Sequence, residues 1–217
     1  MGVKIGDEQF ILLADKALYW PEQKILCIAD AHFGKGAAYR ALGQPVPHGT
    51  TAENIKRLDS LLAHHETRHI IFLGDFLHAP ESHAMATLNV LIKWRAQNKN
   101  IKCTLIRGNH DLRAGDPPAN LAFDVVNEPY LIGAFAFCHT PQIQPDYHVF
   151  AGHVHPVFKI NGKGRQRLKL PCFHHSAEIT ILPSFGEFTG GFVLPNAGRN
   201  KIFITDGKAL WLVNNTL

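Results

Sequence analysis

Side chains that bind metal ions follow five short apolar runs in this sequence. In chain order they are Asp30-x-His32, Gly74-Asp75, Gly108-Asn109-His110-Asp111, His139 and Gly152-His153-x-His155. A carboxylate and an imidazole two residues apart after a strand can reach one ion, and a single carboxylate can bridge two cations. Each motif alone is common in turns. Their joint occurrence in one chain predicts a metal site, and its oxygen and nitrogen ligands favour hard or borderline divalent ions.

The apolar runs predict strands that bring these side chains to one edge of a sheet. The runs span residues 24–32, 69–75, 101–111, 134–139 and 148–155. Between the first three we expect two helices. One begins at Thr50, which has capping-box spacing with Glu53, and the other covers 82–99, with Met85 and Leu91 on its apolar face. Strands that alternate with helices pair in parallel, and their ligand crevice lies beyond their carboxyl ends.

The remaining sequence is typical of one compact domain over residues 1–217. The chain has 46% hydrophobic and 18% charged residues, which favours a packed core. After residue 156 we expect strands at 179–183, 191–195, 201–205 and 209–213. No apolar run approaches the roughly 18 residues that span a bilayer, so we expect a cytoplasmic protein without membrane contact. The net charge of +4 is too mild to identify a partner.

In this order the motifs resemble those of the calcineurin-like metallophosphoesterases. The resemblance implies an α/β fold in which two mixed β-sheets form an αββα sandwich with flanking helices. It also implies two divalent metal ions with Asp75 as the bridge. One ion would be held by Asp30, His32, Asp75 and His155, and the other by Asp75, Asn109, His139 and His153. Manganese fits this oxygen and nitrogen shell best, with iron or zinc as alternatives.

The resemblance leaves His110 outside both ligand sets. This histidine could protonate the leaving oxygen or stabilise the charge of the transition state, with Asp111 as a candidate for orienting it. Three further segments resemble the bacterial ligase-associated DNA damage response endonucleases, namely residues 74–79, 167–173 and 182–191. This narrower resemblance implies a phosphodiesterase or endonuclease that acts on DNA in repair, beside a DNA ligase and a helicase.

Substrate contacts and the exact reaction stay open at this stage. His78 could touch the substrate or belong to an ordinary loop. Lys163, Arg165 and Arg167 could grip a nucleic-acid backbone or form a solvated hairpin. The same metal ligands could serve a phosphatase or a nucleotide pyrophosphohydrolase. A non-catalytic interaction scaffold is a further alternative, although the full set of ligand positions and His110 argue against it.

Overall fold

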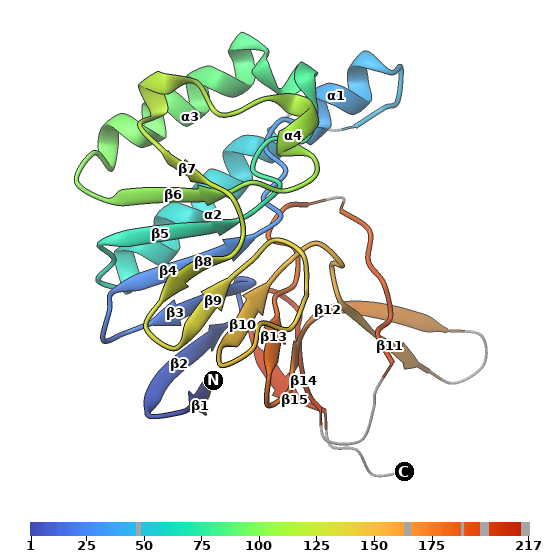
Figure 1. Ribbon diagram of the computed structural model, residues 1–217. Helices are drawn as coiled ribbons and strands as arrows, with labels where there is room; N and C mark the ends of the chain where they lie inside the picture. The colour runs from blue at the N-terminus through green and yellow to red at the C-terminus, as the bar shows by residue number, and fades with distance from the viewer. Residues whose placement is uncertain (47–48, 163–165, 188, 196–199, 214–217) are drawn as a thin grey trace.

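Two mixed β-sheets pack face to face, and helices cover the outer side of the first sheet (Figure 1). The computed structural model describes residues 1–46, 49–162, 166–187, 189–195 and 200–213. The prediction of an α/β fold with two mixed sheets and flanking helices is confirmed. The assignment of residues 1–217 to one domain stays a prediction.

The first sheet consists of seven strands in sequence order. They are β1 (Gly2–Ile5), β2 (Glu8–Leu13), β3 (Ala17–Trp20), β4 (Ile25–Ala29), β5 (His69–Leu73), β6 (Lys102–Ile106) and β7 (Asp124–Val126). Strands β1 to β4 pair antiparallel, whereas β4 to β7 pair parallel, as the alternation of strands and helices predicts. The sequence analysis did not predict strands β1 to β3.

Strand β4 shows why the parallel strands are apolar throughout. Successive side chains point to opposite faces of a sheet, and both faces of β4 are covered. Leu26 and Ile28 lie in the core under the helices, whereas Cys27 and Ala29 lie in the core between the two sheets. The polar residue Asp30 follows directly, at the point where the strand ends.

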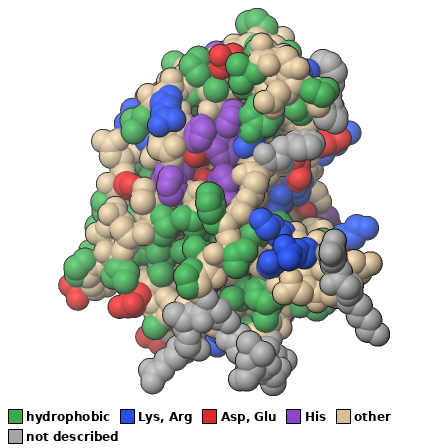
Figure 2. All heavy atoms as spheres, turned by 90° about the vertical axis from the view of Figure 1, so that its right-hand side faces the viewer, with side chains coloured by type: hydrophobic (Ala, Val, Ile, Leu, Met, Phe, Trp, Pro, Cys, Tyr) green, Lys and Arg blue, Asp and Glu red, His purple; other side chains and the backbone are tan. Residues whose placement is uncertain are grey.

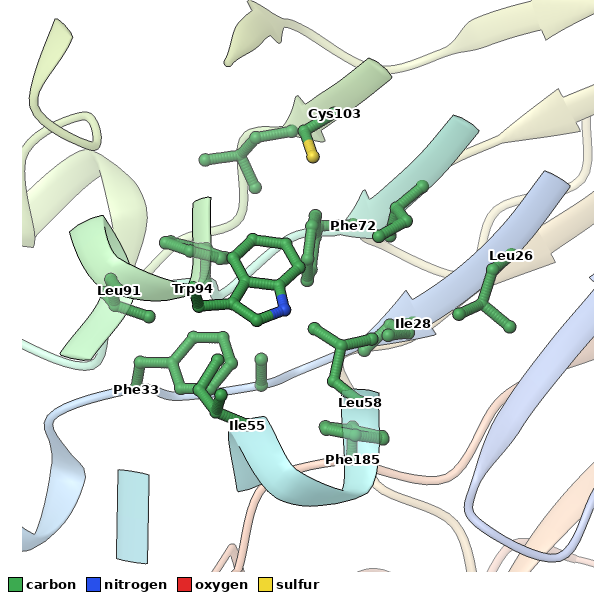
Figure 3. Packing of buried hydrophobic residues seen from close by; sticks show 14 of the residues in the cluster. Leu26, Ile28, Phe33, Ile55, Leu58, Phe72, Leu91, Trp94, Cys103 and Phe185 are labelled. Atoms are coloured by element: carbon green, nitrogen blue, oxygen red, sulfur yellow. The ribbon is translucent and has the colours of Figure 1, made fainter. Parts of the chain in front are cut away.

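Among the described residues, the helices all precede β7: α1 (Lys35–Ala41), α2 (Thr50–His64), α3 (Met85–Gln97) and α4 (Asp111–Ala114), with 3₁₀ turns η1 (Pro80–His83) and η2 (Ala119–Leu121). Figure 3 shows Leu58 of α2 and Trp94 of α3 packed together with Phe72 of β5. The second sheet carries no α-helix of its own among the described residues.

Three details of the predicted helices are wrong. Thr50 is the first residue of α2 and not its cap. The N-cap is Gly49, whose φ of 94° suits glycine, and no side chain caps this end. The helix predicted over 82–99 begins only at Met85, because Ala84 has a ψ of 140° and separates it from η1. Met85 is 67% exposed instead of buried, and Trp94 occupies the core.

The second sheet is built from β8 (Tyr130–Ile132), β9 (Phe135–Phe137), β10 (His148–Ala151), β11 (Val157–Asn161), β12 (Arg167–His175), β13 (Ile179–Ile181), β14 (Lys201–Thr205) and β15 (Leu210–Leu212). The C-terminal third is therefore β-structure, as predicted. Residues 191–195 are the exception. Gly190 has a φ of 66° and turns the chain, so that only Phe192 pairs, in a single bridge with Pro156.

Leu58 tests how much the packing of the helices on the first sheet contributes to stability. Its side chain is fully buried in the core between α2 and the sheet. We expect Leu58→Ala to lower the free energy of unfolding by about 2–5 kcal/mol, because it leaves a cavity. Ser60→Ala, on the exposed side of the same helix, should change it by less than about 0.5 kcal/mol. Denaturant unfolding measures both, and equal values would contradict the assignment of this core.

Candidate metal centre

The seven predicted ligand residues follow the carboxyl ends of five strands in the two sheets. Asp30 and His32 follow β4, Asp75 follows β5, Asn109 follows β6, His139 follows β9, and His153 and His155 follow β10. Figure 2 shows histidine side chains gathered in the upper half of one face of the molecule, with an acidic group visible among them. The structure therefore brings all seven residues to one place.

Two carboxylates lie buried at the centre of this group. Asp30 is fully buried and Asp75 is 2% exposed. Both oxygens of Asp30 accept hydrogen bonds from the backbone N–H of His153, at 3.1 and 2.9 Å, and Asp75 Oδ1 accepts one from the N–H of His110 at 2.8 Å. Burial raises the pKa of Asp75; the charge of His139 opposes this shift, and that of Asp30 adds to it. Two adjacent buried acids require compensating positive charge.

Asp75 lies between two groups of ligand atoms. Its Oδ2 is 3.7 Å from Nε2 of His32, and its Oδ1 is 3.6 Å from Nε2 of His139. Two sets of side chains around it could each hold an ion: Asp30 with His32 and His155, and Asp30 with Asp75 and His139. The ligand atoms within each set lie within 4.8 Å of one another.

Hydrogen bonds fix which nitrogen of two histidines faces the centre. His139 donates from Nδ1 to the carbonyl of Leu73 at 3.0 Å, and His155 donates from Nδ1 to the carbonyl of Thr189, also at 3.0 Å. When Nδ1 carries the proton, Nε2 keeps its lone pair. Such backbone partners are typical of histidines that bind metals. Burial lowers the pKa of His32, which keeps this third ring neutral and able to bind a cation.

Distances between the inward atoms fit a shared ion. Ligand atoms about 2.1 Å from one ion, at angles of about 90° to 110°, lie roughly 3.0–3.4 Å from each other. His139 Nε2 is 3.0 Å from both Asn109 Oδ1 and His153 Nδ1. His155 Nε2 is 3.4 Å from both His32 Nε2 and Asp30 Oδ1. The donor atoms therefore fit two divalent cations.

The backbone at the ligand positions adopts an unusual conformation. Five of the predicted ligands have left-handed φ values, between 44° and 71°: Asp30, His32, Asp75, His153 and His155. Residues other than glycine rarely adopt such values, and strained conformations of this kind cluster at functional sites. The bends turn these side chains from their strands toward the common centre.

His110 and His78 lie at the edge of the ligand group. The His110 ring stacks on that of His78 at a centroid distance of 4.8 Å and donates from Nδ1 to the His78 carbonyl at 2.7 Å. His78 Nδ1 is 3.2 Å from Nδ1 of His32. The sequence analysis suggested Asp111 as the residue that orients His110, but the Asp111 carboxylate binds other groups. Its carboxylate is 1% exposed and accepts the backbone N–H groups of Phe76, Leu77 and Gly108, so it holds two loops together.

Lys35 is a residue that the sequence analysis missed. It lies on α1 and is 9% exposed. Burial is the largest cause of the lowered pKa of His32 and His78, and the positive charge of Lys35 is the second largest. Lys35 therefore brings a buried positive charge to the edge of the metal centre. Its only signal in the sequence is its position three residues after His32.

Arg167 is the one residue of the predicted basic run Lys163, Arg165 and Arg167 that the structure describes. Arg167 is exposed at the start of β12 and pairs in register with Asn161. Lys163 and Arg165 fall outside the described residues. Whether this run binds nucleic acid stays a prediction.

Comparison with known proteins agrees with the fold and with a metal-dependent phosphoesterase. The sequence model of the calcineurin-like phosphoesterases matches residues 23–190, and the chain belongs to this family of metal-dependent phosphoesterases. The crystal structure of the Pseudomonas putida nuclease MPE is similar over 98% of this chain and 99% of its own, with 43% sequence identity and a TM-score of 0.87.

Other comparisons add little. A protein of unknown function from Aquifex aeolicus matches 65% of this chain and 82% of its own at 18% identity, and its TM-score of 0.42 is too low to support an argument. None of the curated proteins matches the chain significantly. Within the described residues, no helix has the length and apolar character needed to cross a bilayer.

Gly74 offers a test of the His139 position. A Cβ atom at Gly74 would lie 2.1 Å from Nδ1 of His139, and the φ of 77° adds strain. We expect Gly74→Ala to displace the ring and weaken metal binding about 10- to 100-fold, the usual effect of losing an outer contact of a ligand. Gly6→Ala is the control, because Gly6 has a φ of 59° and no atom within 4 Å. Equal metal affinity of the two variants would contradict this placement of His139.

Proposed function

We propose that this protein is a nuclease that uses two divalent metal ions to hydrolyse phosphodiester bonds in DNA. The observation that carries the proposal is the position of Asp75, whose two oxygens face two different histidines across a buried centre. In the proposed arrangement Asp30, His32, Asp75 and His155 hold one ion, and Asp75, Asn109, His139 and His153 hold the other. Manganese fits these ligands best, with iron or zinc as alternatives.

The protein groups define what the site can do with a phosphodiester. Bound divalent cations would act as Lewis acids on the phosphoryl group and on the attacking water. Two such ions would bring more positive charge than Asp30 and Asp75 cancel, so the loaded site would attract phosphate oxygens. Lys35 adds to this attraction from α1. The buried carboxylates and their backbone donors hold the ligands in position before substrate arrives.

His110 is the proposed proton donor. Its Nδ1–H is committed to the carbonyl of His78, which leaves Nε2 as the atom that can exchange a proton. Water attacks phosphorus and releases one proton to the solvent, while the bond from phosphorus to the leaving oxygen breaks. Protonated His110 gives its Nε2 proton to this oxygen and takes a proton back from the solvent afterwards. His78 supports the His110 ring by stacking and is also a candidate substrate contact.

The choice of DNA as substrate rests on similarity. The Pseudomonas putida nuclease shares 43% of its residues over almost the full length of both chains, which favours a nuclease over a phosphatase or a nucleotide pyrophosphohydrolase. In this proposal Lys163, Arg165 and Arg167 contact the DNA backbone. The enzyme would work in the cytoplasm, in a repair system with a DNA ligase and a helicase.

A panel of substrates in the presence of Mn²⁺ tests the reaction class. Hydrolysis of single- or double-stranded DNA and of simple diesters, with little turnover of monoesters and nucleotides, supports the proposal. Turnover confined to monoesters or nucleotides favours the phosphatase or pyrophosphohydrolase alternative. A lack of any turnover would favour the scaffold.

Metal removal should abolish hydrolysis, and Mn²⁺ should restore it. Asp75→Asn should lower kcat/KM by roughly 10³-fold, because both ions share this carboxylate and several kcal/mol of charge stabilisation depend on them. Asp7→Asn is the matched control, since Asp7 is fully exposed in a surface ion pair with Lys4. Undiminished turnover in excess chelator would overturn the metal-dependent mechanism.

His110→Asn should separate catalysis from metal binding. The variant should keep its metal content, while turnover of DNA falls by about 10² to 10⁴, the usual contribution of a general acid. The loss should shrink for nitrophenyl esters, because nitrophenol leaves without protonation. Equal losses for both substrates would assign His110 to stabilisation of phosphoryl charge. Loss of metal together with the imidazole would contradict its role as a donor outside the ligand sets.

A further inference from the structure

A cavity of about 350 Å³ opens beside the metal centre, on the side of His155. The residues that line it include His155, Thr189, Lys16, Lys169, Ser184 and Glu187. His155 and Thr189 connect it to the ligand group, because Nδ1 of His155 donates to the Thr189 carbonyl. Figure 2 shows Lys and Arg side chains on the same face as the histidines, below them. None of the roles assigned so far uses this cavity.

The topology of the first sheet brings Lys16 to this cavity. Strand β3 runs antiparallel to β4, so the residue before β3 lies at the edge where β4 ends and Asp30 begins. The backbone of Lys16 has a left-handed φ of 65°, and its backbone N–H donates to the carbonyl of Leu13. The hydroxyl of Thr205 in β14 donates to Ala14 and fixes the same turn. Lys16 is therefore held in place by both sheets.

Lys16 is a buried cation that has to share its counter-ion. Its side chain is 9% exposed, and Nζ lies 3.2 Å from Oε1 of Glu187. The same oxygen accepts a hydrogen bond of 2.6 Å from Arg57, whose guanidinium group also donates to the Phe185 carbonyl and lies over the Phe185 ring. Burial, followed by the charge of Arg57, lowers the pKa of Lys16 to about 8, although Glu187 and Asp15 oppose the shift. The cavity itself is lined by two lysines, Lys16 and Lys169, and one carboxylate, Glu187, so its charged side chains carry a net positive charge.

Lys169 is the second lysine that lines this cavity. It is exposed on β12, where its register partner on β11 is Lys159. Like charges directly opposite each other in a sheet destabilise the pair, and an anion between them or beside them removes this penalty. A lysine has three donors, and Glu187 accepts from only one of those of Lys16. Both lysines can therefore donate to an anion in the cavity.

Glycines keep the remaining wall close to the metal loops. A Cβ atom at Gly186 would lie 2.5 Å from the carbonyl oxygen of Ala31, and one at Gly191 would lie 2.3 Å from Cγ1 of Val157. The N–H of Gly186 donates to the Asp30 carbonyl at 3.0 Å. This wall is therefore tied to the first metal-binding loop, and the cavity has a fixed position relative to the metal centre.

We propose that this cavity is a second phosphate subsite, which binds the phosphate next to the scissile one on the same nucleic-acid strand. The inference rests on the proposed nuclease function. Lys16 and Lys169 bind the second phosphate, while the metal centre binds the first. A polynucleotide has such a neighbouring phosphate, whereas a simple diester does not. The subsite therefore selects nucleic acid over isolated phosphodiesters.

Four chromogenic substrates test the subsite. They are the nitrophenyl esters of thymidine 5′-phosphate, with and without a 3′-phosphate, and of thymidine 3′-phosphate, with and without a 5′-phosphate. Within one of the two pairs, the compound with two phosphates should have a KM about tenfold lower, as expected for hydrogen bonds to a charged group. Lys16→Met and Lys169→Met should remove most of this gain and leave the esters with one phosphate unaffected.

Lys24→Met is the matched control, because Lys24 forms an ion pair with Glu66 away from the cavity. It should keep the gain. Lys169 is exposed, so its variant tests the subsite even where Lys16→Met does not fold. The subsite is overturned if the esters with one phosphate are hydrolysed normally but a second phosphate does not lower KM. It is also overturned if the lower KM persists in both lysine variants. Either result leaves the phosphodiesterase proposal intact. If none of the four esters is hydrolysed, both the subsite and the phosphodiesterase proposal are overturned.

Discussion

The burial of two carboxylates side by side is the constraint on which the site depends. Asp30 and Asp75 have almost no contact with water, and neither has a lysine or arginine as an ion-pair partner among the described residues. The free-energy cost of burying such charges is high unless cations or hydrogen bonds offset it. Backbone N–H groups and imidazoles supply part of the compensation. Divalent cations would supply the rest, so the folded state and the metal-bound state favour each other.

The fold meets this constraint with local strain at the ends of well-packed strands. Strands β4, β5 and β10 are buried along almost their full length and hold the backbone rigidly up to the ligand positions. The strain of the left-handed residues that follow, of the order of 1–3 kcal/mol each, is tolerated because those strands and the paired loops determine the path of the chain. His32 and Phe33, for example, donate their N–H groups to Asp75 and Phe76 of the neighbouring loop.

The strand ends, and the side chains that meet at the candidate metal centre, could be predicted from the sequence because both signals are local. A buried strand appears as an apolar run, and its functional residue follows it directly. Features that depend on tertiary contacts could not be predicted. Gly49 replaces Thr50 as a cap because of its backbone conformation, and Asp111 bonds to distant N–H groups instead of its neighbour His110. The group of Lys16, Arg57 and Glu187 joins segments up to 171 residues apart.

The metal centre also depends on the packing of one sheet against the other. The first sheet contributes both carboxylates, whereas the second contributes His139, His153 and His155. The core between the sheets joins residues such as Ala29 and Leu73, which directly precede the acidic loops, to Phe137 and Phe150 next to the histidine loops. A shift between the sheets would therefore change the distances between carboxylates and imidazoles. The same apolar contacts that stabilise the fold thus set the ligand geometry, and bound metal ions would in turn hold the two sheets together.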